Sequence, residues 1–357
     1  MSAPLPSFLE QAGPAAFTLT MSASFAEQMM LCAAKVAWSR VTGIEAATPR
    51  PGMNYGKGMH LLLAALYDGK PFDAGEILAE HFAANPQPEQ HRGKPEWRTQ
   101  ARALQAFAAY NAAYPAESWE VLGVEEEFEV ELGILEIEGR ESDTYVKVIF
   151  RGIRDLRVRW HDAIWVVDHK TMTEWSDLTA DEGKASFQFQ GYAWVEREFT
   201  RGGGISSAGT TGQTRSQRSE QNRVEQEAAA HAGNQSRPLD LNIGGVIGNY
   251  LIARPPYSEG YKPRANALPR DQFERIPYPF SDAQLDEWHG RAMRLAKRIW
   301  TAWRDEEWDQ HSTACAHWGR CEYYQLCWET DPAYRMSAAL GADYRPRTPS
   351  PLDEADV

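Results

Sequence analysis

An aspartate and a lysine, separated by one residue, follow an apolar run near the middle of this chain. The run Ile-Trp-Val-Val at 164–167 leads directly into Asp168, and Lys170 comes two positions later. Side chains two positions apart on a β-strand point to the same face, so Asp168 and Lys170 are expected to project together. A second carboxylate, Asp155, lies in the preceding segment 151–155. A hairpin between the two segments would place Asp155 beside the pair.

Two carboxylates and a lysine suit metal-assisted chemistry on a phosphate. Carboxylate oxygens are the ligands that hard cations such as Mg²⁺ and Mn²⁺ prefer. A lysine next to such an ion can orient or deprotonate a water, or it can stabilise charge on a phosphate. An isolated Asp-x-Lys pair also occurs on solvated strand edges, so the assignment depends on the other motifs.

Three further motifs surround this pair. His60 closes the sequence Gly-Lys-Gly-Met-His at 56–60, which opens an apolar helical stretch. Glu125 and Glu127 lie two positions apart on a predicted strand before Phe128. Gln188 and Tyr192 lie four positions apart, a spacing that puts both on one face of a helix.

The order of these motifs resembles the PD-(D/E)XK nuclease superfamily, and within it the RecB-like exonuclease branch, over residues 22–327 apart from one insertion. The resemblance implies that Asp155 and Asp168 bind Mg²⁺ or Mn²⁺ and that Lys170 is the catalytic lysine. It also implies that His60 lies near the metal. The family pattern favours Glu125 as the further active-site acid, while Glu127, on the same strand face, stays open.

The resemblance gives roles to the helix after the lysine as well. RecB-like nucleases carry a Gln-x-x-x-Tyr motif at this place, which Gln188 and Tyr192 match. Gln188 is expected to bond a DNA phosphate or to fix the lysine. Tyr192 is expected to pack on a nucleotide, with a buried tyrosine of an amphipathic helix as the alternative.

The four cysteines of the chain match the iron–sulfur positions of the same branch. Cys32 stands alone near the N-terminus, whereas Cys315, Cys321 and Cys327 cluster near the C-terminus. The resemblance implies a [4Fe–4S] cluster that staples the two ends of the nuclease domain, and four thiolates are the right number. Both gaps in the late cluster are five residues long, whereas the family often has two and then five. Zinc, which also takes four thiolates, and free or disulfide-bonded thiols therefore stay open.

Composition sets broad limits. The chain has 357 residues, a hydrophobic content of 43% and a net charge of −13. No apolar run approaches the ~20 residues of a membrane span, and no signal-peptide pattern begins the chain. We expect a cytoplasmic protein, in the host cytoplasm if it is phage-encoded, where disulfides are disfavoured. The acidic balance is atypical of DNA binding, so a local basic groove is expected from Arg151, Arg154, Arg157 and Arg159.

The sequence predicts an α/β fold: a restriction-endonuclease-like core with a central mixed β-sheet flanked by helices, its termini stapled by a four-cysteine metal site. Helices are predicted at 25–38, 58–67, 97–110, 188–199 and 281–308. Strands are predicted at 119–132, 144–155, 156–160, 163–170, 244–252 and 273–280. We expect one nuclease domain over 1–330, with a disordered insertion at 201–238 that is poor in large apolar residues, and a flexible acidic and proline-rich tail at 331–357.

The sequence thus favours a metal-dependent DNA exonuclease of phage or bacterial recombination or repair. Its expected partners are single-stranded or end-bearing duplex DNA, together with recombination or replication proteins, and no membrane. A CRISPR-adaptation nuclease of the same family is the alternative within the family. A non-catalytic DNA-end-binding module with a structural cluster, and a zinc protein with a chance Asp-x-Lys, are the alternatives of other kinds. No phosphate-binding loop of the helicase type is present.

Overall fold

The computed structural model describes residues 5–47, 51–91, 93–138, 143–176, 178–202, 242–255, 271–316, 320–329, 331–339, 341 and 343–347. The chain divides into two compact units, each assembled from separate stretches of sequence. Unit 1 comprises Met1–Thr48, Phe128–Gly152 and Asp282–Val357, and unit 2 comprises Pro49–Glu127 and Ile153–Ser281. Two long strands, β6 (Glu120–Ile137) and β7 (Thr144–Trp160), contribute residues to both units.

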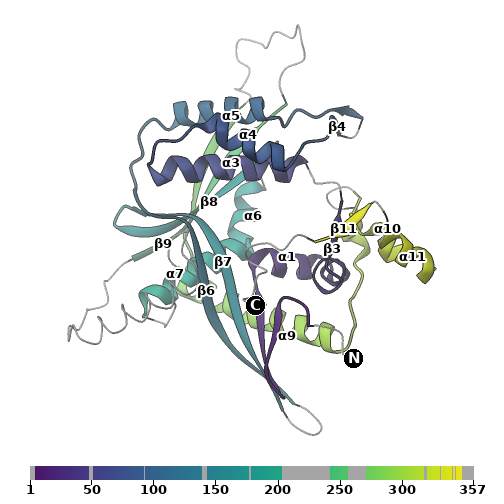
Figure 1. Ribbon diagram of the computed structural model, residues 1–357. Coiled ribbons are helices and arrows are strands. Elements are labelled where there is room, and N and C mark those ends of the chain that lie inside the picture. Colours follow the sequence, from purple (N-terminus) through teal and green to yellow (C-terminus); the bar gives the residue numbers. More distant parts are fainter. Residues whose placement is uncertain are drawn as a thin grey trace. The chain divides into compact units, whose positions relative to one another are not determined.

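Seven of the described strands form a mixed sheet in the order β1-β2-β7-β8-β9-β10, with β6 paired to β7. In unit 1, β1 (Leu9–Gly13) runs antiparallel to β2 (Ala16–Met21), and β2 runs parallel to the first part of β7. In unit 2, the second part of β7 runs antiparallel to β8 (Ala163–Met172). β8 runs parallel to β9 (Asn242–Ala253), which is antiparallel to β10 (Asp271–Tyr278). A central mixed sheet flanked by helices (Figure 1) agrees with the predicted fold class.

The helices of unit 2 pack around this sheet. Three of them, α3 (Pro51–Asp68), α4 (Ala74–Ala84) and α5 (Gln100–Ala113), contact one another. The short strands β4 (Gln90–His91) and β5 (Lys94–Pro95) lie between α4 and α5 in the chain. After β8 come α6 (Thr179–Ala185) and α7 (Phe187–Thr200). Both α3 and α7 contact β8, the strand that carries Asp168 and Lys170.

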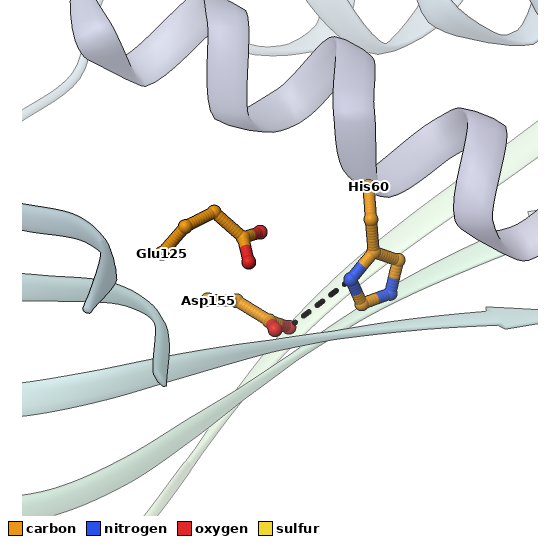
Figure 2. Close-up of side chains that lie close together, drawn as sticks. All are labelled: His60, Glu125 and Asp155. Carbon is orange, nitrogen blue, oxygen red and sulfur yellow. Dashed lines mark ion pairs between the residues drawn. The ribbon is translucent and has the colours of Figure 1, made fainter. Parts of the chain in front are cut away.

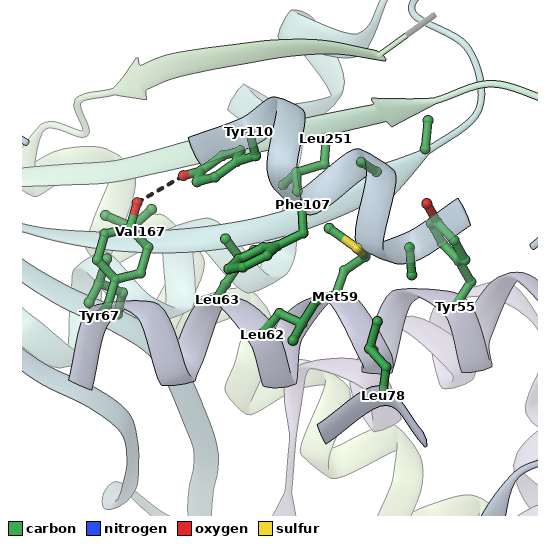
Figure 3. Packing of buried hydrophobic residues seen from close by; sticks show 14 of the residues in the cluster. Tyr55, Met59, Leu62, Leu63, Tyr67, Leu78, Phe107, Tyr110, Val167 and Leu251 are labelled. Carbon is green, nitrogen blue, oxygen red and sulfur yellow. Dashed lines mark hydrogen bonds between the residues drawn. The ribbon is translucent and has the colours of Figure 1, made fainter. Parts of the chain in front are cut away.

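Helix α3 has one apolar face that anchors it in the core of unit 2. Its buried residues Tyr55, Met59, Leu62, Leu63 and Tyr67 recur at helical spacing and meet side chains of α5, β8 and β9 (Figure 3). Proline at the first position suits a helix start, because the missing N–H would have no partner there. Helix α3 therefore begins at Pro51, earlier than the predicted Gly58, and it presents His60 beside the buried face.

Unit 1 joins early and late parts of the chain. Its N-terminal part contains α1 (Ala23–Leu31), α2 (Ala33–Val36), a π-helical turn at Ala37–Val41 and β3 (Ile44–Ala46). Its C-terminal part contains α9 (Asp282–Arg304), a 3₁₀ turn at Ser312–Cys315, α10 (Tyr324–Trp328), α11 (Pro332–Ala339) and β11 (Tyr344–Pro346). The two parts meet in an antiparallel pair of β3 with β11.

Other predicted elements also differ from the structure. The helix expected over 25–38 is interrupted at Cys32, whose backbone is extended with φ −166° and ψ 112°. The strands expected at 144–155 and 156–160 are one strand, β7, in which every second residue from Val146 to Val158 is buried. Most of the insertion predicted at 201–238, and the last part of the predicted tail, lie outside the described residues. The single domain over 1–330 stays a prediction; α11 and β11 fall within the first part of the expected tail.

Candidate active site

A tight hairpin sets the register of the two strands that carry the motif acids. β7 and β8 are joined by His161 and Asp162, whose φ angles are 48° and 57°. Two consecutive left-handed residues are what a type I′ hairpin turn requires. In the ladder that follows, Leu156 lies opposite Val167. Asp155 and Asp168 are the next residues on the two strands, so the turn brings the two carboxylates together as the sequence predicted.

Three groups from three different elements could bind one cation. Ligand atoms of His60 on α3, Glu125 on β6 and Asp155 on β7 all lie within 4.8 Å of one another (Figure 2). Nδ1 of His60 is 3.5 Å from Oδ2 of Asp155. The same Oδ2 accepts a hydrogen bond of 2.7 Å from the backbone amide of His169, which fixes the carboxylate next to β8. An imidazole and two carboxylates are ligands that suit Mn²⁺ and, through their oxygens, Mg²⁺.

Glu125 reaches this group through an unusual backbone conformation. Its φ is 48°, inside strand β6, where an ordinary residue has a negative φ. A left-handed residue interrupts the alternation of side chains along a strand. Glu127, two positions on, has no ligand atom in the described group of possible metal ligands. The geometry therefore favours Glu125 over Glu127. The strand period of two residues places both on one face and could not distinguish them.

Asp168 and Lys170 form the other half of the site. Nζ of Lys170 is 2.9 Å from Oδ2 of Asp168, so the two side chains do project together from β8. Asp168 is buried at 1% exposure, whereas the Lys170 side chain is 40% exposed. Asp168 Oδ2 has this ion pair but, among the described residues, no hydrogen-bond donor of good geometry. The carboxylate is thus buried while the lysine amine beside it reaches solvent.

Helix α7 holds the lysine from the side. Oε1 of Gln188 accepts a hydrogen bond of 2.7 Å from Lys170 Nζ, and Nε2 of Gln188 donates to the Tyr192 hydroxyl at 2.9 Å. The Tyr192 hydroxyl in turn donates to the backbone carbonyl of Ile153 at 2.8 Å. Gln188 therefore fixes the lysine, one of its two expected roles. Tyr192 is only 4% exposed, which favours the alternative of a buried tyrosine over packing on a nucleotide.

Crowded, buried charges shift the pKa values of the site in opposite directions. Burial raises the pKa of Glu125 to about 7 and that of Asp168 to about 6, and the charge of Asp155 adds to both shifts. Burial alone would raise the pKa of Asp155 too, but the charge and hydrogen bond of His60 lower it to about 2. Burial would lower the pKa of His60, but Asp155 raises it to about 9. A divalent cation among these groups would favour the ionised form of every carboxylate.

A buried aromatic and polar network backs the site. His169, between the two motif residues, is 2% exposed and stacks on Tyr67 at 5.9 Å between ring centroids. Its Nδ1 lies 2.8 Å from Nδ2 of Asn249. The His169 ring also meets the His60 ring edge to face at 5.8 Å. Burial lowers the pKa of His169 to about 3, so this ring is neutral and adds no charge next to His60.

Three of the four arginines expected to line a basic groove pair with carboxylates of the chain. Arg154 is buried at 2% exposure and bonds Glu196 of α7, which also accepts from Nε of Arg157 at 2.9 Å. Arg159 pairs with Glu120 at 2.6 Å. The expectation is wrong for Arg154 because a buried guanidinium is held by carboxylates of its own chain. Sequence reasoning missed this pair, although the alternation of buried residues along β7 places Arg154 at an inward position.

A separate pocket, in unit 1, gathers the cysteines. Cys32, Cys315, Cys321 and Cys327 all line it, together with Lys35 and His311. Two indole N–H groups donate to the sulfurs: Trp38 to Cys327 at 3.3 Å and Trp328 to Cys315 at 3.4 Å. Burial raises the pKa of the Cys327 thiol, and the Trp38 hydrogen bond opposes this shift. The sequence prediction that one early and three late cysteines come together agrees with this pocket.

Comparison with known proteins places the chain in a family. No curated protein matches its sequence. A solved structure described as "Crystal structure of SSO0001" is 11% identical and covers 67% of this chain and 74% of its own, with a TM-score of 0.22, too low to support an argument about the fold. None of the described helices combines the length and apolar character that a membrane span requires.

The model of the PD-(D/E)XK nuclease superfamily matches residues 20–328. With this match over most of its length, and with the acids and lysine of its hairpin assembled in one site, the chain belongs to the PD-(D/E)XK nuclease superfamily.

Proposed function

We propose that the protein is a Mg²⁺- or Mn²⁺-dependent DNA exonuclease of the RecB-like type. The observation that carries the proposal is the convergence of His60, Glu125 and Asp155 beside the Asp168–Lys170 pair. Members of the superfamily are generally metal-dependent nucleases. The Gly-x-x-x-His and Gln-x-x-x-Tyr motifs, whose residues border this same site, support the RecB-like branch and with it attack from DNA ends.

The side chains divide the work of phosphodiester hydrolysis. His60, Glu125, Asp155 and the buried oxygen of Asp168 would hold the cation. Such an ion polarises a phosphoryl oxygen and lowers the pKa of water. Lys170, kept in place by Gln188 and able to reach solvent, is positioned to orient the attacking water or to stabilise the charge that develops on the phosphate.

Digestion of labelled DNA tests this function. Linear single- and double-stranded DNA, labelled at one end, and a covalently closed circle of the same sequence are incubated with Mg²⁺, with Mn²⁺ and with a chelator. We expect loss of the linear DNA from its ends with either metal, an intact circle, and no cleavage with the chelator. Cutting of the closed circle would contradict an exonuclease, and absence of all cleavage would contradict a nuclease.

A lysine variant separates an enzyme from a DNA-end-binding module. Lys170→Ala should keep metal binding, because its amine is not a ligand, and should lose ~10²-fold or more in cleavage rate. Calorimetric titration with Mn²⁺ and the digestion assay measure the two properties. A Lys170→Ala protein that cleaves at the wild-type rate would show that the lysine has been assigned wrongly.

We also propose a [4Fe–4S] cluster on the four cysteines, as a structural centre. All four cysteines line one pocket of unit 1, and four thiolates are the number that such a cluster takes. Hydrogen bonds from Trp38 and Trp328 suit thiolates better than neutral thiols. Iron and sulfide content and a visible spectrum after anaerobic purification test the cluster, and tight zinc in a colourless protein would contradict it.

A further inference from the structure

Helix α7 presents three polar side chains at intervals of four residues. Gln188, Tyr192 and Glu196 therefore share one face of the helix. The first two hold Lys170 and the carbonyl of Ile153. Glu196, one turn further on, is 0% exposed and bonds the buried guanidinium of Arg154. The Gln-x-x-x-Tyr face of α7 is thus extended by a buried carboxylate.

Arg154 connects this helix with the strands that carry the acids. It directly precedes Asp155 on β7. Its Nη2 lies 3.6 Å from Oε2 of Glu126, which directly follows Glu125 on β6. Its guanidinium also lies over the ring of Phe199 on α7, 5.1 Å from the centroid. One buried arginine, itself next to Asp155 in the chain, therefore contacts the neighbour of Glu125 and the helix that fixes the lysine.

Stability alone does not account for this pair. Removing a guanidinium and a carboxylate from water is costly, and a buried ion pair can often be replaced by apolar side chains without loss of stability. Breaking such a pair by removing one partner is strongly destabilising, because it leaves a buried charge without compensation. An apolar pair at these two positions would fill the space but would not fix the angle between β6, β7 and α7.

We propose that Arg154 and Glu196 are positioning residues that hold Glu125, Asp155 and Lys170 in register with one another. Glu196 anchors α7 to β7, and Arg154 extends the anchor to β6. The pair touches neither cation nor DNA and acts through the residues beside it. The inference rests on the proposed function, since it assigns a role relative to the metal site.

The test separates positioning from folding by comparing three proteins. Glu196→Met alone should lower the melting temperature, because Arg154 loses its buried partner. Arg154→Met/Glu196→Met should recover the melting temperature, yet bind Mn²⁺ ~10- to 100-fold more weakly than wild type, the usual effect of losing residues that orient metal ligands. Calorimetry measures Mn²⁺ binding without DNA, and cleavage rates are measured over a series of Mn²⁺ concentrations. A double variant with wild-type melting temperature and wild-type Mn²⁺ affinity would overturn the inference.

A second variant covers the case in which the double variant does not fold. Glu196→Asp keeps the charge but shortens the side chain, so that it cannot reach Arg154 and Arg157 as before. It should fold and show the same weakened Mn²⁺ binding; wild-type binding would overturn the inference. Arg159→Gln is the matched control, because Arg159 lies on the same strand and makes an exposed pair with Glu120 of β6. It should leave Mn²⁺ affinity unchanged, and a loss equal to that of Glu196→Asp would overturn the inference as well.

The same data distinguish this inference from the proposed function. A wild-type protein that binds Mn²⁺ but does not cleave DNA would overturn the nuclease, while the affinities of the variants would still decide the inference. Cleavage by wild type together with unchanged affinity in the variants would overturn the inference alone. A wild-type protein that binds no Mn²⁺ would overturn both.

Discussion

At the scale of the residue, Glu125 has an unfavourable backbone conformation that places its side chain in the candidate metal site. A left-handed conformation costs a residue with a side chain ~1–2 kcal/mol relative to its ordinary conformation. Such conformations persist where the surroundings impose them, and they gather at functional sites. Here the conformation turns a carboxylate toward His60 and Asp155. The positive φ is therefore an independent reason to select Glu125 from a run of three glutamates.

Two matched substitutions test that selection. Glu125→Gln removes a charged ligand and should weaken Mn²⁺ binding and lower the cleavage rate by ~10²-fold. Glu127→Gln removes the same charge two positions away and should change both by less than a factor of about two, since Glu127 has no ligand atom in the group of His60, Glu125 and Asp155. Calorimetry and the digestion assay measure the two effects. Equal losses in the two variants would mean that the strand's general negative charge, and not one ligand, binds the metal.

At the scale of the element, the β7–β8 hairpin could be predicted from the sequence. The partner of Arg154 on β7 could not. The apolar run, the Asp-x-Lys spacing and the period of two predicted that Asp168 and Lys170 would lie together. The strand boundary predicted at Asp155 is wrong, because the alternation of buried residues along β7 continues through it. Glu196 lies on a distant helix, and no local pattern links it to Arg154. Likewise no local pattern links the break at Cys32 to the C-terminal part of unit 1, where the backbone amide of Ala34 donates to the carbonyl of Asp309 at 3.0 Å.

Strand β9 depends on a glycine in an irregular part of its pairing with β8. The register shifts between Ile164 and Trp165, and Gly245, opposite Trp165, has a φ of +126°. A Cβ at Gly245 would lie 2.1 Å from the backbone carbonyl oxygen of Tyr278. This contact involves backbone atoms that cannot move without displacing β10. Gly245 is therefore required for both its conformation and its lack of a side chain.

Substitution of this glycine should destabilise the protein more than its φ angle alone explains. Gly245→Ala combines left-handed strain with a backbone clash and should lower the free energy of unfolding by about 3 kcal/mol. Gly69→Ala is the control, because Gly69 also has a positive φ, of 72°, but nothing within 4 Å of the added Cβ. It should cost about 1 kcal/mol. Urea unfolding measures both, and an equal cost for the two would refute the clash.

At the scale of the whole molecule, one long segment differs in composition from the rest. Residues 202–236 are rich in Gly, Ser, Thr, Gln, Arg and Glu and lack large apolar side chains, except for Ile205 and Val224. Ordering such a segment would cost backbone entropy with little apolar burial in return. We therefore expect it to be dispensable for folding, although nearly all of it lies outside the described residues.

Deletion tests this expectation. Replacing 203–236 by a short Gly/Ser bridge between α7 and β9 should leave the melting temperature nearly unchanged, because lengthening or shortening a flexible loop changes its closure entropy only slowly. Calorimetric melting of the full chain and of the deletion variant provides the measurement. A fall of many degrees would show that the segment packs against the rest of the protein.

Contacts other than those of the cysteines join early and late parts of the chain in unit 1. The β3–β11 ladder pairs Tyr344 with Ala46, and the Tyr323 hydroxyl donates to the carbonyl of Ile44 at 2.9 Å. Lys35 pairs with Glu322 at 2.9 Å. These contacts close a loop of nearly the whole chain without a metal. A cluster on the four cysteines would add a covalent closure of the same loop, which removes entropy from the unfolded state much as a long-range disulfide does.

Loss of Cys32 should therefore remove the cluster and lower stability together. Cys32→Ala leaves three thiolates, too few for a fully ligated [4Fe–4S] cluster, so iron, sulfide and visible absorbance should fall and the melting temperature should drop. Nuclease activity should fall only as far as folding does, because the cysteines and the metal-binding acids belong to different units. Trp38→Phe is the matched control: it removes a hydrogen bond to Cys327 but no ligand, and it should retain its iron. Full iron and sulfide content in anaerobically purified Cys32→Ala would show that the N-terminal cysteine is not a ligand, and the closure of unit 1 would then rest on the ladder and its side-chain contacts alone.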